Sequence, residues 1–271
     1  MNAVGSVQPI EKLPTDITGF DVVCRGGLLT GRTTLVSATS GSATTVRAVQ
    51  FLAAGAKTGE RCALFACEAS REQLVRNASG WGIDFETMER DGLLLVVCAS
   101  PDVMGLEDHL VLIKSTIAQF KPNRVAVDSL SALERVSTLR GFREFVIGLT
   151  SFIKQQEVAG WFTSMTGTLL GGSSVTEAHI STITDSIILP RYVEMHGAMR
   201  RGLTVLKMRG SMRDKDIREL TIDHQGMPIG RAFRDVTGIL AGNPRHVSPG
   251  LPRWGGRAVQ RSVSTPSDPH A

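Results

Sequence analysis

The stretch that decides the fold reads Thr33-Thr34-Leu35-Val36-Ser37-Ala38-Thr39-Ser40-Gly41-Ser42-Ala43-Thr44-Thr45. Its first part, residues 33–37, is the apolar and β-branched kind of run that forms a buried strand. Residues 46–56 follow with the composition of a helix. A phosphate-binding loop has the pattern G-x-x-x-x-G-K-[ST] between a strand and a helix of this kind. The stretch therefore occupies the place of a phosphate-binding loop.

The loop departs from that pattern at three positions. Ala38 and Ala43 stand where the pattern has its outer glycines, and Thr44 stands where it has lysine. The internal Gly41 and the final hydroxyl residue, Thr45, still fit. Backbone N–H groups of such a loop surround the phosphates, and the following helix adds its positive end. The residues predicted to contact a nucleotide are Thr39, Ser40, Gly41, Ser42, Ala43, Thr44 and Thr45.

The substitutions weaken the binding of phosphate by an amount that can be estimated. An alanine forced into left-handed backbone geometry costs roughly 1–2 kcal/mol. Losing one charge-assisted hydrogen bond costs about 1.5–3 kcal/mol, which is roughly 10- to 100-fold in affinity. The loss is larger in a transition state, where charge on the phosphates redistributes. Taken alone, the segment is equally compatible with a strand–loop–helix that never bound phosphate.

Length and composition are those of an ordinary folded protein. The chain has 271 residues and a net charge of only +4, so the charge does not argue for a nucleic-acid partner. No N-terminal segment resembles a signal peptide, and the longest apolar stretch, residues 93–99, is too short to span a bilayer. The cysteines lack metal-ligand spacing, and Cys62, Cys67 and Cys98 are predicted to be reduced core residues. We expect a cytoplasmic protein without a membrane or nucleic-acid partner.

Strand-like and helix-like segments alternate along most of the chain. The strand-like runs are residues 33–37, 61–67, 93–99, 124–128 and 160–164. The helical patterns between them are residues 44–56, 71–80, 106–120 and 142–156. This alternation predicts an α/β fold with a mainly parallel sheet that helices cover on both faces.

The pattern changes after residue 181. Shorter β-rich runs at residues 186–193, 203–208 and 219–223 predict antiparallel additions to the sheet. Pro190 interrupts the first of these runs, which predicts a bulge or an edge strand there. The polar residues 1–12 and the Pro-, Gly-, Ser- and Arg-rich residues 247–271 are predicted to be disordered. Residues 13–246 remain as the folded domain.

Several residues outside the loop fit a nucleotide-binding fold. Asp128 ends an apolar strand, which is the place of the carboxylate that helps hold Mg²⁺ beside the loop hydroxyl. Glu68 follows another strand, at the kind of strand end that lines a ligand crevice, where it would act as a base. Lys207 and Arg209 lie on one side of a strand and are candidates to stabilise phosphate charge. Ordinary strand-end carboxylates and a solvated cationic face are the alternative interpretation.

Motifs along nearly the whole chain resemble a single ATPase family. The opening motifs are Ile17-Thr18-Gly19-Phe20-Asp21, Gly26-Gly27-Leu28 and Gly31-Arg32-Thr33-Thr34-Leu35-Val36. The later motifs are Arg76-Asn77-Ala78-Ser79-Gly80-Trp81-Gly82-Ile83-Asp84-Phe85, Gly105-Leu106-Glu107-Asp108-His109-Leu110, Val127-Asp128-Ser129-Leu130-Ser131-Ala132-Leu133 and Glu177-Ala178-His179-Ile180-Ser181-Thr182-Ile183-Thr184-Asp185. Together they resemble KaiC, the family of RecA-like ATPases and autokinases of circadian clocks. The opening resembles that family's first ATPase domain, and the body resembles its second, autokinase domain.

The resemblance implies a RecA-like P-loop NTPase fold, with ATP and Mg²⁺ as cofactors. It aligns Thr45 with the Mg²⁺-binding hydroxyl and Asp128 with the Mg²⁺-binding carboxylate. It aligns Glu68 with the first of two catalytic glutamates, whereas Ala69 stands in place of the second.

The resemblance also implies events between subunits. Ser181 and Thr182 align with the Ser–Thr pair that the family phosphorylates on itself. Lys207 and Arg209 align with cations that reach ATP on the neighbouring subunit of a hexameric ring. The implied partnership is self-association, or mixed rings with KaiC-like subunits.

Three functions are compatible with these residues. The favoured hypothesis is a KaiC-like regulatory or signalling protein with weakened or lost ATPase and autokinase activity, that is, a pseudo-enzyme in which ATP and Mg²⁺ bind weakly or not at all. The second is a still-active ATPase and serine/threonine autokinase. The third is an interaction protein that retains only the fold. Both enzymatic reactions need the γ-phosphate held in line, so keeping an acceptor residue does not by itself keep a kinase.

Overall fold

The computed structural model describes residues 11–39, 44–166, 180, 182–195, 197–221, 228–234, 236–240 and 245–246. The predicted tail, residues 247–271, and nearly all of the predicted N-terminal segment lie outside these ranges. The first described strand begins at Lys12, next to the predicted start of the domain.

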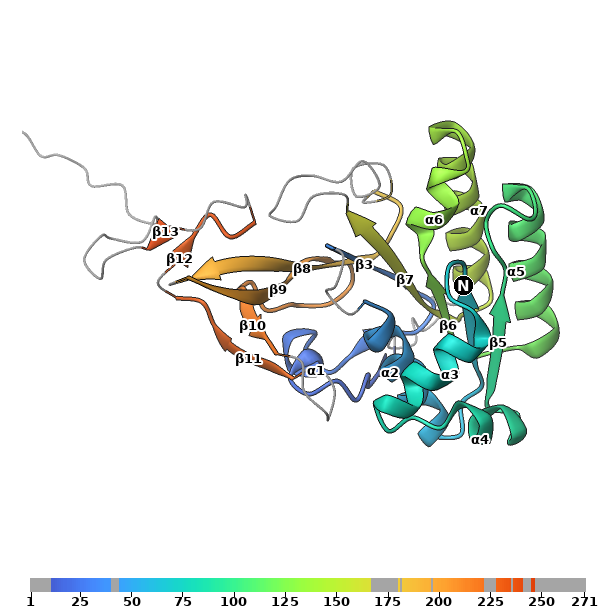
Figure 1. Cartoon of the computed structure of the whole chain (residues 1–271), viewed down its shortest axis with the longest axis horizontal. Coiled ribbons are helices and arrows are strands. Elements are labelled where there is room, and N and C mark those ends of the chain that lie inside the picture. The colour runs from blue at the N-terminus through green and yellow to red at the C-terminus, as the bar shows by residue number, and fades with distance from the viewer. Residues whose placement is uncertain are drawn as a thin grey trace, which may run out of the picture.

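A large mixed sheet forms the centre of the described chain (Figure 1). Its nine strands within the described residues run in the order β11-β10-β9-β8-β3-β7-β6-β4-β5. The pairs from β8 to β5 are parallel, and β8 to β11 pair antiparallel. The strands of this sheet are β3 Thr33–Thr39, β4 Cys62–Ala66, β5 Leu94–Cys98, β6 Arg124–Asp128, β7 Ala159–Thr166, β8 Ser186–Met195, β9 Ala198–Met208, β10 Arg218–Leu220 and β11 Ile229–Ala232. Two small two-stranded sheets lie outside this large sheet. They are β1 Lys12–Leu13 with β2 Leu28–Leu29, and β12 Val236–Thr237 with β13 Arg245–His246.

Helices cover both faces of the parallel part of the sheet. The described helices are α1 Phe20–Val23, α2 Thr44–Lys57, α3 Arg71–Gly80, α4 Phe85–Arg90, α5 Leu106–Phe120, α6 Leu130–Arg135 and α7 Leu139–Gln155. One core cluster joins residues of α1 to α4 with strand residues such as Val36 and Leu64. A second cluster joins α5, α6 and α7 with the strand neighbours Leu35, Ala63 and Phe65. Because side chains alternate along a strand, each buried strand supplies both layers.

Local signals at the helix ends agree with the tertiary fold. Ser70 and Gln73 form a capping box at the start of α3, and Thr138 accepts a hydrogen bond from the Gly141 N–H at the start of α7. Lys121 closes α5 in left-handed geometry with a φ of 53°. These caps define the residues at which α3 and α7 begin and at which α5 ends.

The predicted fold class is confirmed: this is the RecA-like arrangement of a mostly parallel sheet with antiparallel strands added on one side. The register of the β8–β9 pair shifts between Ile187 and Ile188, two residues before Pro190. Pairing of β8 with β3 ends at Ile188, so Pro190 lies beyond the last β3 partner. The prediction for Cys98 was wrong, because this residue is exposed at the end of the edge strand β5. None of the described helices combines the length and apolar character needed to cross a bilayer.

Candidate functional site

Several predicted site residues meet at the carboxyl edge of the parallel strands. Thr39 ends β3, Asp128 ends β6, and Glu68 follows β4 by two residues. The helix α2 begins at Thr44, just after β3. In sheets of this kind, ligands bind outside the carboxyl ends of the strands. The strand order therefore brings together groups that are far apart in the chain.

The Asp128 carboxylate is held by two hydroxyl groups. Thr45 Oγ1 donates to Asp128 Oδ2 at 2.7 Å, across 83 residues of sequence. Thr163 Oγ1, on β7, donates to Asp128 Oδ1. A hydroxyl paired with a carboxylate supplies the oxygen ligands that Mg²⁺ prefers, so this pair fits a magnesium ion.

Burial raises the pKa of Asp128 above its usual range. The hydrogen bonds from Thr163 and Thr45 oppose that shift, and the nearby negative charge of Glu68 adds to it. A divalent cation at this place favours the ionised carboxylate, because it supplies the missing positive charge.

Both carboxylate oxygens of Glu68 are engaged in the structure. Ser129 Oγ donates to Glu68 Oε2 at 2.8 Å, and Arg135 Nη2 donates to Glu68 Oε1 at 2.6 Å. Ser129 Oγ also lies 3.0 Å from Ser131 Oγ, which accepts from the Met165 N–H. Glu68 must release at least one of these partners before it can take a proton from water or a hydroxyl.

A second group of charged residues lies at the opposite, amino edge of β3. Asp185 is 1% exposed and accepts hydrogen bonds from the Thr33 N–H at 3.1 Å and from Thr33 Oγ1 at 3.2 Å. Lys154 Nζ lies 3.0 Å from Asp185 Oδ2, and Arg32 Nη1 lies 3.5 Å from Oδ1. This carboxylate therefore ties the segment before β8 to the start of β3.

Lys207 and Arg209 contact the same segment. Lys207 Nζ donates to the Thr184 carbonyl at 2.7 Å, and Arg209 Nη2 donates to the Thr182 carbonyl at 3.2 Å. Burial lowers the pKa of Lys207, and the positive charge of Arg209 lowers it further. The side chain of Thr182 is exposed. The cations Lys207 and Arg209 thus lie beside the segment that carries the candidate phosphate acceptor Thr182.

The two edges are separated by the length of β3. Six steps from Thr33 to Thr39, at about 3.3 Å per residue, put them about 20 Å apart. The structure brings Thr45, Asp128 and Glu68 together, and it does not bring Thr182, Lys207 or Arg209 to them. Ser40, Gly41, Ser42, Ala43 and Ser181 lie outside the described residues.

Sequence reasoning missed several residues around the carboxyl edge. Thr163, Ser129 and Arg135 hold the two carboxylates, but each looked like part of an ordinary strand or loop. Arg47, in the first turns of α2, is fully buried. Burial lowers the pKa of Arg47 to about 9, and the positive charge of Arg201 contributes. One signal was visible: Arg47 is the one charged residue within residues 46–56.

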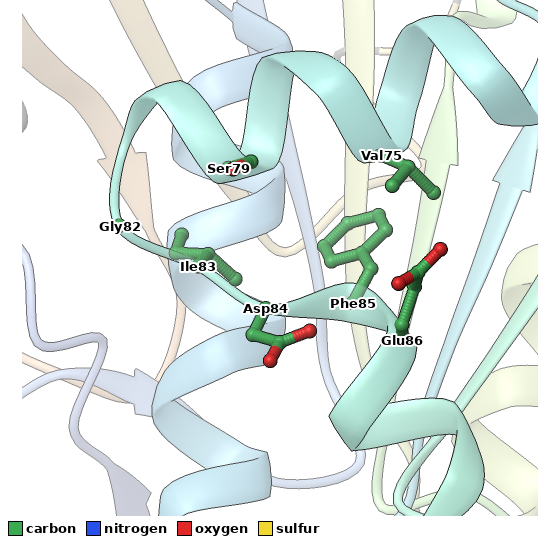
Figure 2. A pocket seen from close by; sticks show the side chains of 7 residues that line it. All are labelled: Val75, Ser79, Gly82, Ile83, Asp84, Phe85 and Glu86. Carbon is green, nitrogen blue, oxygen red and sulfur yellow. The ribbon is translucent and has the colours of Figure 1, made fainter.

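A surface cavity of about 250 Å³ lies away from these groups, between α3 and α4. Figure 2 shows the side chains of Val75 and Phe85 next to each other there, with the carboxylates of Asp84 and Glu86 at the same opening. None of the predicted site residues lines this cavity. It is therefore separate from the candidate site.

Comparisons with known proteins identify the family. A family model described as "ATPase: KaiC" matches residues 13–232. The "circadian clock protein KaiC3" of Synechocystis sp. is 64% identical over 229 residues, which are 84% of this chain and 45% of that protein. The "circadian clock oscillator protein KaiC" of Thermostichus vulcanus is 50% identical over 237 residues, which are 88% of this chain and 46% of that protein. The chain thus spans about half the length of the curated relatives it matches. A match over most of its length, together with the RecA-like sheet, shows that the chain belongs to the KaiC family.

Proposed function

We propose that this chain is a KaiC-type signalling protein that binds magnesium–ATP weakly and turns it over slowly or not at all. The observation that carries the proposal is the pair formed by Thr45 and Asp128 at 2.7 Å, directly beside a threonine where a lysine should be. The groups that fit the metal remain, whereas the cation that neutralises phosphate charge is replaced by Thr44. Binding therefore suffers less than catalysis, because charge stabilisation counts most in the transition state.

The residues of the carboxyl edge have distinct roles in this proposal. Thr45 and Asp128 hold Mg²⁺, which supplies positive charge to the phosphates. Glu68 is the base that orients and deprotonates a water or a hydroxyl group. In the structure Ser129 and Arg135 hold both of its oxygens, and Ala69 follows it where the family resemblance implies a second glutamate. Each feature lowers the rate of proton transfer.

Phosphorylation of Ser181 or Thr182 would require two subunits. Thr182 and its neighbours Lys207 and Arg209 lie about 20 Å from the end of β3 that leads to the loop. A phosphoryl group held by one subunit therefore meets the acceptor of another, and the same cations reach across to it. This supports self-association, or mixed rings with KaiC-like subunits, as the partnership of this chain.

A role in circadian timing is part of the proposal. It rests on the names of the relatives, which are circadian clock proteins about twice the length of this chain. A subunit that binds nucleotide without rapid turnover would act by joining or modulating assemblies of active subunits.

Titration with magnesium–ATP and a hydrolysis assay test the proposal directly. Weak binding and little or no hydrolysis are expected for the full chain. The triple variant Ala38→Gly, Ala43→Gly, Thr44→Lys should gain roughly 10- to 100-fold in ATP affinity, because it restores the loop cation and its flexibility. Submicromolar binding with measurable hydrolysis by the unaltered chain would refute the loss of activity, and would favour the active ATPase and autokinase.

Sizing of the full chain with and without ATP tests assembly. We expect monomers or small oligomers without nucleotide, because weak ATP binding leaves little to hold a ring together. A hexamer that forms without nucleotide contradicts this expectation. If no nucleotide binds and the triple variant gains nothing, the loop is not the limiting defect, and an interaction protein that retains only the fold is favoured.

A further inference from the structure

β5 is the last strand of the large sheet, and its outer side has no strand partner among the described residues. Figure 1 shows β5 at the outside of the sheet, with α5 alongside it. The Ala99 N–H, directly after the strand, donates to the Ala66 carbonyl of β4 at 3.0 Å. Because backbone groups alternate in direction along a strand, Leu94, Val96 and Cys98 point theirs away from β4. They form a row of backbone groups with which another strand can pair.

The sequence of β5 lacks the features that normally prevent such pairing. Edge strands usually carry a charge, a proline or a bulge. β5 reads Leu94-Leu95-Val96-Val97-Cys98, and its register with β4 runs without a shift. The opposite edge strand, β11, contains Gly230 and Arg231, and its register with β10 does shift. Of the two edges in the described sheet, only the β5 edge is thus open to strand addition.

An uncharged groove accompanies this edge. A cavity of about 340 Å³ lies between β5 and α5, and its lining residues are Leu95, Val97, Thr116, Gln119 and Phe120. One turn earlier on the same face of α5 stand Leu112 and Ser115, and the first charged residue beyond them is Asp108. In a chain with 21% charged residues, this surface resembles the centre of a protein interface, where charged residues are depleted.

A second copy of this chain fits the surface in both register and charge. A two-fold axis at Val96 places Leu94 opposite Cys98 of the second copy, so outward-facing backbone groups meet outward-facing groups. Leu95 then lies opposite Val97 of the second copy, and the side chains that line the groove in one copy fill the groove of the other. A charged surface would repel its own copy, whereas this uncharged one does not.

We propose that two copies of this chain pair antiparallel through β5, so that the sheet continues across a two-fold axis with the two α5 helices beside it. This dimer goes beyond the proposed function, because it needs neither nucleotide nor turnover. β5 and β9 lie on opposite sides of the centre of the sheet, so the contact is separate from the one proposed for Lys207 and Arg209.

The mass of the full chain without nucleotide, measured by light scattering over a range of protein concentrations, tests the dimer. Val96→Lys places two ammonium groups opposite each other at the axis and should weaken dimerisation roughly 100-fold. Gln119→Arg adds charge from the helix side of the groove and should weaken it roughly 10-fold. The control Val111→Lys makes the same change as the first variant at a 64% exposed position of α5 outside the groove, and should leave the dimer unchanged.

Cross-linking tests the register. Residues opposite each other in a hydrogen-bonded antiparallel pair have Cα atoms about 5.5 Å apart, which is within disulfide range. With oxidised glutathione, Val96→Cys in a Cys98→Ser background should therefore give a disulfide-linked dimer. Val111→Cys in the same background is the control and should remain monomeric under denaturing, non-reducing conditions.

Several results would overturn the inference. One is a chain that stays monomeric at every concentration. Another is a dimer that Val96→Lys and Gln119→Arg leave unchanged, since it would use a different surface. If Val96→Lys does not fold, as its melting curve would show, Gln119→Arg and the cross-link decide the question. Assembly that appears only with ATP would also overturn this dimer, and would leave the proposed nucleotide-dependent self-association standing.

Discussion

The two ends of β3 differ in how their charged groups are arranged. At the amino end, Asp185 contacts Thr33, Lys154 and Arg32, and every contact lies within the protein. At the carboxyl end, Asp128 accepts hydrogen bonds from the hydroxyl groups of Thr45 and Thr163, and burial raises its pKa. The carboxylate at the amino end thus has cations as partners, whereas the carboxylate at the carboxyl end, Asp128, has hydroxyl groups as partners. We infer that the amino end serves stability and orientation, and the carboxyl end serves binding.

The largest expected effect on stability is at the amino end. Asp185→Asn removes a buried charge that faces two cations, so it should lower the free energy of unfolding by about 3 kcal/mol. The side chains of Lys154 and Arg32 are 31% and 35% exposed, so water solvates them in part once Asp185 has lost its charge. The expected loss therefore lies at the lower end of the roughly 3–5 kcal/mol that breaking a buried ion pair costs. Urea denaturation of the variant and of the unaltered chain measures this loss of unfolding free energy. The control is Asp16→Asn, whose exposed pair with Lys57 should contribute less than about 1 kcal/mol. Equal effects at the two sites would remove the basis for calling the amino end a stabilising cluster.

Thr45→Val is the next test and acts at the carboxyl end. It deletes the hydroxyl that donates to Asp128, at a cost of about 1.5 kcal/mol for a hydrogen bond to a charged group. Added Mg²⁺ and ATP should stabilise the unaltered chain in thermal denaturation and have no effect on the variant, because the hydroxyl is also the proposed metal ligand. Ligand stabilisation of the variant equal to that of the unaltered chain would exclude Thr45 from the metal site.

Asp128→Asn should change the pH dependence of stability. A carboxyl with a raised pKa in the folded state contributes stability that is present below its unfolded pKa and is lost as the pH rises through the folded pKa. The asparagine variant lacks this loss. Its stability relative to the unaltered chain should therefore improve from about pH 4 upward in metal-free buffer, since about 4 is the ordinary Asp pKa. A difference that stays flat with pH, or falls, would contradict a raised pKa.

The smallest effect is expected for Arg135→Ala. Arg135 forms an ion pair with Glu68, and the two side chains are 59% and 36% exposed, respectively. Losing this pair should therefore lower the free energy of unfolding by no more than about 1 kcal/mol. Freed from one partner, Glu68 becomes more available as a base, and any residual hydrolysis should rise. Arg140→Ala breaks a more exposed pair with Glu144, away from the carboxyl edge, and serves as the control. A large loss of stability for Arg135→Ala alone would make this pair a structural element of the carboxyl end.

Local patterns predicted the elements that carry the site. The alternation of β-branched strands with helical periodicity predicted β3, α2 and the parallel sheet, because each signal lies within a few neighbouring residues. Strand-end position was enough to select Asp128 and Glu68 as candidates. The exposure of Cys98 was not predicted, because an apolar run does not show whether its strand is central or at an edge.

The sequence by itself determined the α/β class and the strand–helix junction at which Thr44 stands where the phosphate-loop pattern has lysine. These follow from short-range chemistry that needs no knowledge of the sheet order. Only the tertiary structure decided that Thr45 meets Asp128, that Arg135 and Ser129 hold Glu68, and that the Thr182 segment lies at the far edge of β3. Such contacts join residues far apart in the chain, as Thr33 and Asp185 do across 152 positions. They depend on which strands are neighbours, because strand order sets which side chains share an edge and which face the interior.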